Sequence, residues 1–255
     1  MTRIQKQRYA RAVLLAQDKI ALKYQRKIRA ELKIVSKELA ESYKVNQSNA
    51  DFDTVRNAHK KRMIVILSEL AQVTAQAFKA FNFKPEKKDI FGNFVENNIY
   101  AILTAEAMAV AGTVSNNTIA TAQLVITQVM AASINNPTIS EPENIALLIA
   151  NRIGGVSAIG RAMTIARTET HKAANVSQYT RAESAALDSG LEVEVEWIST
   201  NDSRVRDNHK HADGQKRAIG NPFNVGGELM MFPSDPNASA SNTINCRCVL
   251  GYDTK

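Results

Sequence analysis

Two cysteines and two histidines are the side chains of this sequence whose types and spacing could support chemistry. The only cysteines, Cys246 and Cys248, stand one residue apart near the end of the chain, after a loop rich in Pro, Asn and Ser. His209 and His211 lie earlier in the same region. Zinc binds thiolate and imidazole ligands in a tetrahedron, so these four residues are candidate zinc ligands. Zinc is therefore a possible cofactor of this protein, and a metal-dependent hydrolase is an alternative function.

A buried strand is the competing interpretation of the two cysteines. Residues i and i+2 of an extended strand lie about 6.5 Å apart on one face, whereas two sulfurs that share a zinc ion lie within about 4 Å. The run Arg247-Cys248-Val249-Leu250 has the pattern of a strand, so Cys246, Cys248 and Leu250 would form one buried face. Redox chemistry is the third alternative, although a disulfide across a single residue would be strained. The pattern favours packing of the two thiols.

An Asp-x-Arg-x-Arg-x-x-His run, Asp202 to His209, is the second polar constellation. Arginines at alternate positions can hold carboxylates in bidentate pairs, and the candidate carboxylates are Asp202, Asp213 and Glu169. The sequence has no glycine-rich phosphate loop and no paired acids at helical spacing, so no catalytic residue is predicted. We expect a buried polar network, with a binding surface as the alternative. His59 and His171 are predicted to be ordinary helix residues.

Long helices must position these residues. Apolar stripes at helical spacing predict helices over 3–45 and 53–81, with Ile28, Leu32, Val35 and Leu39 on the first and Met63, Leu67, Leu70, Ala77 and Phe81 on the second. Phe83-Lys84-Pro85 ends this pattern, and two or three Ala-rich helices are expected from about Ile90 to Ile134. Asn135-Asn136-Pro137 predicts a turn.

Capping and strand signals follow. Ser140-Glu141-Pro142-Glu143 resembles a capping box that opens a helix through Ile149, and Gly154-Gly155 breaks that helix. The next helix is expected from Ser157 to Leu187, with Gly190 as its stop. LEVEVEWIST alternates apolar residues with glutamates, which predicts a half-buried strand. Further strand-like pieces are Glu228–Phe232 and Cys246–Tyr252.

The predicted fold class is a mainly α N-terminal region with a small α+β C-terminal domain. The first domain spans residues 1–155, with a basic helical hairpin at 3–82 and Ala-rich helices at 90–150. The second domain spans residues 156–255. Two cysteines are too few for a disulfide scaffold, so a reducing compartment is expected. We find no signal peptide and no apolar span, so no membrane partner is expected.

Positive charge is concentrated at the N-terminus. The chain has 255 residues and a net charge of +7, while residues 1–50 alone hold 12 Lys and Arg against 4 acids. Without interleaved aromatic residues, this segment suits phosphate contacts on double-stranded DNA rather than base stacking. A solvated helix face is the alternative. The candidate DNA-binding residues are Arg3, Lys6, Arg8, Arg11, Lys19, Lys23, Arg26, Lys27 and Arg29.

The ordered pieces of the C-terminal half resemble a known family. They are an Arg-Thr-Glu helix, a Trp, the Asp-Arg-Arg-His run, Asp-Gly, Pro-Phe, a Pro-containing loop at Pro233 and a closing Asn-Cys-Arg-Cys. Over about residues 150–252 they resemble the C-terminal domain of phage Mu F-like minor head proteins, the phage head-morphogenesis family. The motif residues are Arg167, Glu169, Trp197, Asp202, Arg204, Arg206, His209, Asp213, Gly214, Pro222, Phe223, Cys246, Arg247 and Cys248.

The resemblance implies a minor structural protein of a tailed-phage head. Such a protein acts in head assembly at or near the portal vertex, with a link to DNA packaging or delivery. It would contact the portal, the major capsid protein or the scaffold, and double-stranded DNA. It would be found in the virion after assembly in the host cytoplasm. It would not be an enzyme, and no cofactor is expected beyond the open question of zinc. Arg167 and Glu169 would either brace their helix against the Arg204–Arg206 loop or be solvated surface charge.

Overall fold

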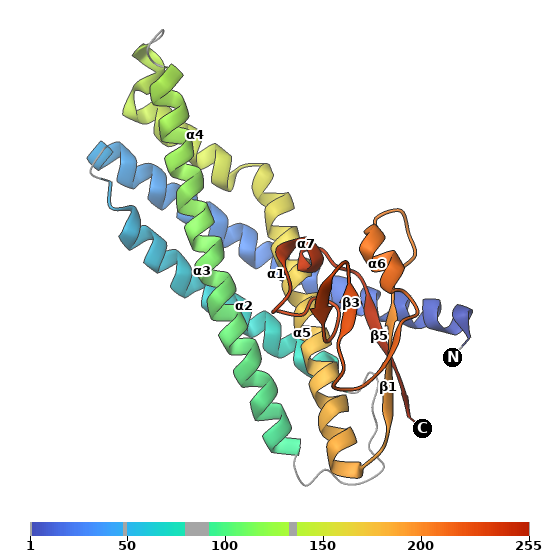
Figure 1. Ribbon diagram of the computed structural model, residues 1–255. Coiled ribbons are helices and arrows are strands. Elements are labelled where there is room, and N and C mark those ends of the chain that lie inside the picture. Colours follow the sequence, from blue (N-terminus) through green and yellow to red (C-terminus); the bar gives the residue numbers. More distant parts are fainter. Residues whose placement is uncertain (1, 48–49, 80–91, 133–136, 255) are drawn as a thin grey trace. The chain divides into compact units, whose positions relative to one another are not determined.

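The structure is a computed structural model that describes residues 2–47, 50–79, 92–132 and 137–254 (Figure 1). The predicted break at Phe83-Lys84-Pro85 lies outside these residues, as do Phe81 and the Asn135-Asn136 part of the predicted turn. The chain divides into two compact units, each built from separate segments. The first unit contains Met1–Ala21, Glu69–Glu106 and Arg167–Lys255, and the second contains Leu22–Ser68 and Ala107–Ala166.

These units do not coincide with the two segments expected from the sequence. Part of the N-terminal helical region belongs to the same unit as the C-terminal strands, because helices of more than 40 residues run through both units. The predicted fold class is confirmed: long helices come first, and a small region with antiparallel strands follows. That residues 156–255 form a domain of their own stays a prediction.

Five long helices make up most of the chain: α1 (Arg3–Asn46), α2 (Phe52–Ala77), α3 (Gly92–Ala132), α4 (Pro142–Gly154) and α5 (Ser157–Ser189). The prediction of two or three helices between 90 and 134 is wrong, because α3 is continuous. Its sequence holds no proline and only one internal glycine, Gly112, so nothing in it ends the helix. By length and composition alone, the stretch Pro142–Ser189 could cross a membrane, a test that core helices of soluble proteins also pass.

The ends of α4 and α5 test the capping signals. The predicted capping box is wrong: Ser140 belongs to a short 3₁₀ turn, η2 (Pro137–Ser140), and the N-cap residue Glu141 makes no side-chain capping bond. Pro142 at the first helical position presets the helical φ angle and starts α4 instead. The break at Gly154-Gly155 is confirmed. Gly190, at a φ of +68°, ends α5 as predicted.

The second unit is a helical bundle. Ile28, Leu32, Val35 and Leu39 are completely buried, which confirms the apolar stripe of α1. Val35 and Leu39 pack with residues of α3 and α4 in one core, so the stripe contacts more than a hairpin partner. His59 is not an ordinary helix residue, because it is buried with its Nδ1 2.8 Å from Oε1 of Glu31, which also accepts a bond from Arg62.

The first unit contains the strands. β1 (Val193–Ile198) lies between β2 (Lys216–Ala218) and β5 (Val249–Thr254) in an antiparallel sheet, and β3 (Phe223–Val225) pairs with β4 (Glu228–Met230). The alternation predicted for β1 is confirmed, since its Val and Trp side chains are buried while Glu194 and Glu196 are half-buried. These two glutamates pair with Lys216 and Lys6, at 2.6 Å each.

The core of the first unit lies between α5 and the strands (Figure 1). It contains Trp197, Phe223, Phe232, Leu250 and both cysteines, together with Ala71 and Ala75 of α2. Ala77, predicted to continue the stripe of α2, is exposed. Two short helices complete the unit, α6 (Asp207–Ala212) and α7 (Ala240–Thr243). Irregular connections between these short elements bring the motif residues together.

Candidate functional site

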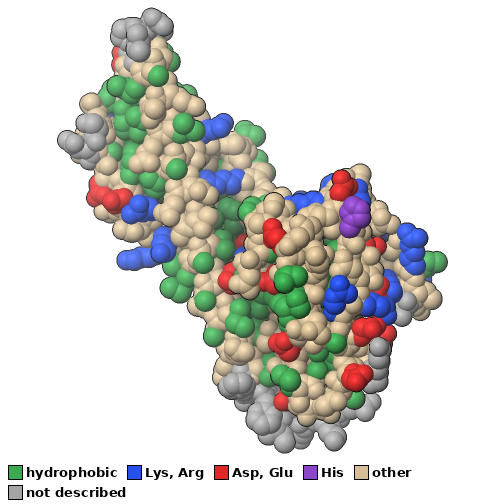
Figure 2. All heavy atoms as spheres, in the orientation of Figure 1, with side chains coloured by type: hydrophobic (Ala, Val, Ile, Leu, Met, Phe, Trp, Pro, Cys, Tyr) green, Lys and Arg blue, Asp and Glu red, His purple; other side chains and the backbone are tan. Residues whose placement is uncertain are grey.

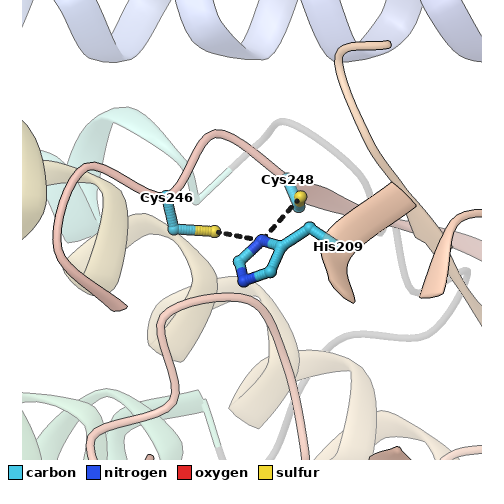
Figure 3. Close-up of side chains that lie close together, drawn as sticks. All are labelled: His209, Cys246 and Cys248. Carbon is cyan, nitrogen blue, oxygen red and sulfur yellow. Dashed lines mark hydrogen bonds between the residues drawn. The ribbon is translucent and has the colours of Figure 1, made fainter. Parts of the chain in front are cut away.

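One histidine and both cysteines form a compact buried cluster (Figure 3). Nδ1 of His209 lies 3.3 Å from Sγ of Cys248 and 3.7 Å from Sγ of Cys246. These three atoms all lie within 4.8 Å of one another. His209 and Cys248 are each 1% exposed, and Cys246 is 4% exposed. The cluster is therefore closed to bulk water.

The thiols converge because the cysteine segment is not a strand. β5 begins at Val249, so both cysteines precede it. The predicted strand Cys246–Tyr252 is confirmed only from Val249 on, and the predicted burial of Cys246, Cys248 and Leu250 is confirmed. The separation of the two sulfurs argued from an extended cysteine segment is wrong. Asn245 has a φ of +54°, a left-handed conformation that asparagine tolerates, and this turns the chain just before Cys246. The backbone N–H of Asn245 donates to Oγ1 of Thr168 at 3.1 Å, which ties the turn to α5.

His211 is not part of the cluster. It is exposed, whereas His209 on the same short helix is buried. Residues two apart on a helix point to nearly opposite sides, so α6 can direct only one of them into the core. Of the four ligands expected from the sequence, the structure brings together three.

The orientation of His209 is fixed by a second hydrogen bond. Its Nε2 lies 3.2 Å from Oδ1 of Asn242. That oxygen also accepts a bond from Asn208, and Nδ2 of Asn242 donates to the carbonyl of Val225 at 3.4 Å. Because Oδ1 only accepts, Nε2 of His209 carries the proton. The lone pair on Nδ1 then faces the two sulfurs, as in histidines that bind metals.

The pKa values of the two thiols are shifted in opposite directions. Burial opposes ionisation of Cys246, but hydrogen bonding, first of all with Cys248, outweighs it and lowers the pKa of this thiol well below its usual value. The hydrogen bond to Cys246, together with burial, raises the pKa of the Cys248 thiol well above its usual value.

His171 of α5 completes the surroundings of the cluster, although the sequence suggested no special role for it. Its Nε2 lies 2.7 Å from the carbonyl oxygen of Cys248, and its Nδ1 lies 2.8 Å from Oε1 of Gln17. His171 follows Thr168 by three residues, so both lie on one helix face. That spacing, beside the Arg-Thr-Glu motif, is the signal that could have identified it.

The Asp-Arg-Arg-His run forms only part of the expected arginine–carboxylate network. Asp202 pairs with Arg247, and Arg204 lies 3.5 Å from the same carboxylate. Arg206 donates to the backbone carbonyl of Ile244 rather than to an acid. Asp213 accepts a bond from the backbone N–H of Ser199 at 2.6 Å. These contacts hold the loop through backbone atoms as much as through charge.

Arg167 and Glu169 do not brace α5 against this loop. Among the described residues, Arg167 pairs with Asp18 at 3.4 Å and Glu169 pairs with Lys172 at 3.2 Å. Burial raises the pKa of Glu169, although Lys172 opposes this shift. Thr168, between the two charged residues, makes the contact with the cysteine turn.

The other motif residues pack around the cluster. The ring of Trp197 is buried and meets the rings of His209 and Phe223 edge-on, at centroid distances of 5.7 and 5.5 Å. Gly214 ends α6 at a φ of +79°, and its N–H donates to the carbonyl of Trp197 at 2.8 Å. The carbonyl of Pro222 accepts a bond from Arg217.

The basic residues of α1 are not equally available for binding. The exposed ones are Arg3, Arg8, Arg11, Lys19, Lys23 and Arg26. Lys6 is paired with Glu196, Lys27 lies over the ring of Tyr24 at 5.1 Å, and Arg29 is half-buried. On the face drawn in Figure 2, Lys and Arg side chains are scattered among acidic and apolar ones.

Comparison with protein families identifies the class of this helical chain: it is a phage head-morphogenesis protein. The family model described as Phage Mu protein F like protein matches residues 115–251, more than half of the chain. The chain therefore belongs to the phage Mu protein F-like family. The match begins within α3, about 35 residues before the start of the region in which the motifs resemble the family. No curated protein and no solved structure gives a significant match.

Proposed function

We propose that this protein is a minor structural component of a tailed-phage head that acts in head assembly at or near the portal vertex. Family membership carries the proposal, because the match includes every motif residue from Arg167 to Cys248. The protein would be assembled into the head in the host cytoplasm and remain in the virion.

The motif residues suit a structural role better than the alternative of a hydrolase. A catalytic zinc site keeps one position open for water or substrate. His209, Cys246 and Cys248 are buried almost completely, and their neighbours bind backbone atoms. We therefore propose no catalytic step for this cluster.

Exposed apolar side chains of the second unit support contact with another protein. Val65, Leu124, Leu147 and Val156 are each more than half exposed. Covering exposed apolar side chains with a partner protein removes them from water, which is favourable. We propose that the partner is the portal, the major capsid protein or the scaffold.

Binding of double-stranded DNA during packaging or delivery is the second role that we propose. In the first unit, Arg8, Arg11 and Lys19 are exposed on α1, and at about 100° per residue they fall within about 80° of its circumference. A stripe of this kind suits phosphate contacts without sequence reading.

The test is to detect and cross-link the protein in purified particles. We expect a low copy number in proheads and virions. Residues near Leu124 or Leu147 should cross-link to the portal or to its neighbours. A Leu147→Ser variant should fold normally but complement a deletion phage poorly, while the control Leu229→Ser, exposed in the first unit, should complement. Complete, infectious heads assembled without the protein would contradict the proposal.

A further inference from the structure

We propose that Cys246, Cys248, His209 and His171 form a structural zinc site that closes the C-terminal fold. The first three residues supply converging ligand atoms, and His171 is the expected fourth ligand. This inference concerns a metal and is independent of where the protein lies in the phage particle.

The distances in the cluster match those of a zinc tetrahedron. With Zn–S bonds of about 2.3 Å and Zn–N bonds of about 2.0–2.1 Å, the edge between a sulfur and a nitrogen is about 3.6 Å. The two observed distances from Nδ1 of His209 to sulfur, 3.3 and 3.7 Å, lie on either side of this value. An ion could therefore be bound with only small movements of these side chains.

Charge balance also favours a divalent cation. Two thiolates and neutral imidazoles carry a charge of −2, which one zinc ion neutralises within a buried site.

The surroundings have the hydrogen bonds that metal ligands require. His209 donates its other ring N–H to Asn242, which directs Nδ1 to the sulfurs. The indole N–H of Trp197 is buried without an acceptor in bonding geometry, and Trp197 belongs to the same core as Cys248. A metal-bound thiolate is a better acceptor for this N–H than a neutral thiol is.

The fourth position is assigned to His171 because a buried structural site is closed by four protein ligands. Nδ1 of His171 donates to Gln17, the outer bond typical of a ligating histidine, so Nε2 is the ligand nitrogen. This nitrogen now lies 2.7 Å from the carbonyl oxygen of Cys248. A turn of the ring from the carbonyl towards the ion would complete the set.

Metal analysis of the untagged full chain tests the proposal. After expression with added zinc and dialysis, we expect about one zinc ion per chain in the wild type. The zinc content of the Cys246→Ala/Cys248→Ala variant should be lower than that of the wild type by about tenfold or more. The His209→Gln and His171→Gln variants should bind zinc more weakly. His211→Ala is the matched control, because this exposed histidine of the same helix should leave the zinc content unchanged.

Cobalt substitution gives a test that needs no variant. Wild-type protein stripped with a chelator and refilled with Co²⁺ should show thiolate-to-cobalt charge transfer and the visible bands of tetrahedral cobalt. A wild-type chain with reduced thiols that binds neither zinc nor cobalt would overturn the proposal, as would zinc retained in full by the double cysteine variant. Full zinc content in His171→Gln would overturn the assignment of the fourth ligand.

Discussion

The ion pair between Asp202 and Arg247 should be the main charged link between the Asp-Arg-Arg-His loop and the cysteine turn. Both side chains are 33% exposed, whereas Arg204, the second arginine near the same carboxylate, is 69% exposed. Removing Arg247 should therefore destabilise the first unit more than removing Arg204 does.

The expected magnitude follows from exposure and bond type. A hydrogen-bonded charge pair that is one-third exposed is screened by water, so we expect a coupling of about 1 kcal/mol. Asp202→Ala also removes the acceptor of the Arg204 backbone N–H, and should cost about 2 kcal/mol in total. Asp202→Asn keeps that acceptor and should cost about 1 kcal/mol. For Arg204→Ala, the expected loss is below about 0.5 kcal/mol.

Denaturant unfolding followed by the fluorescence of Trp197 is the appropriate assay. Trp197 is the only tryptophan and is completely buried in the core of the first unit, so it reports on this unit. A double-mutant cycle of Asp202→Ala and Arg247→Ala isolates the coupling. A coupling near zero, or equal losses for Arg204→Ala and Arg247→Ala, would refute the reasoning.

The same pair predicts a dependence on pH. Burial opposes ionisation of Asp202, but its bonds to the Arg204 backbone and to Arg247 outweigh it and lower the pKa of this carboxyl. A lowered pKa in the folded state gives stability that is present above the unfolded value of about 3.9 and is lost as the pH falls through the folded value. The difference in stability between wild type and Asp202→Asn should therefore shrink below about pH 4.

Three further predictions concern the cysteines, one glycine and the basic helix. The Cys246→Ser/Cys248→Ser variant should lose about 1–3 kcal/mol for each buried thiol that is replaced by the more polar hydroxyl. Thiol reagents should label the native cysteines slowly, and rapid labelling would contradict burial. Gly214→Ala should cost about 1–2 kcal/mol from backbone strain alone, because the added carbon meets no atom within 4 Å. DNA binding should fall steeply between about 50 and 200 mM salt and weaken in Arg8→Glu/Lys19→Glu, whereas the paired Lys6→Gln should change it little.

The long helices could be predicted because each follows one repeated pattern. Ile28, Leu32, Val35 and Leu39 recur at helical spacing and are all buried. The number of helices between 90 and 134 could not be predicted in the same way. Ala favours a helix strongly and Thr disfavours it mildly, but these propensities do not distinguish one long helix from two shorter ones. The absence of proline is the signal in the sequence that α3 continues.

Most of the C-terminal fold lay beyond prediction from the sequence. β2 and β3 have three residues each, too few for an alternating pattern to stand out, whereas β4 lies within the predicted piece Glu228–Phe232. The position of the cysteines depended on one backbone angle, that of Asn245, which no periodicity reveals. The motif residues were found, but their partners were assigned as carboxylates when many are backbone atoms.

The way these motif residues are used explains why a small irregular fold needs them. Strands of three residues and helices of four to six bury little apolar surface, so their connections must be fixed by specific bonds. Each main contact joins the cysteine turn or the loop after β1 to a segment distant in the chain: Arg206 to Ile244, Asp213 to Ser199, Thr168 to Asn245, and His171 to Cys248. Most of these bonds use a backbone atom on one side, so they fix the path of the chain whatever side chain that partner carries. A zinc ion at the same place would add one more link, because its ligands come from α5, α6 and the cysteine turn.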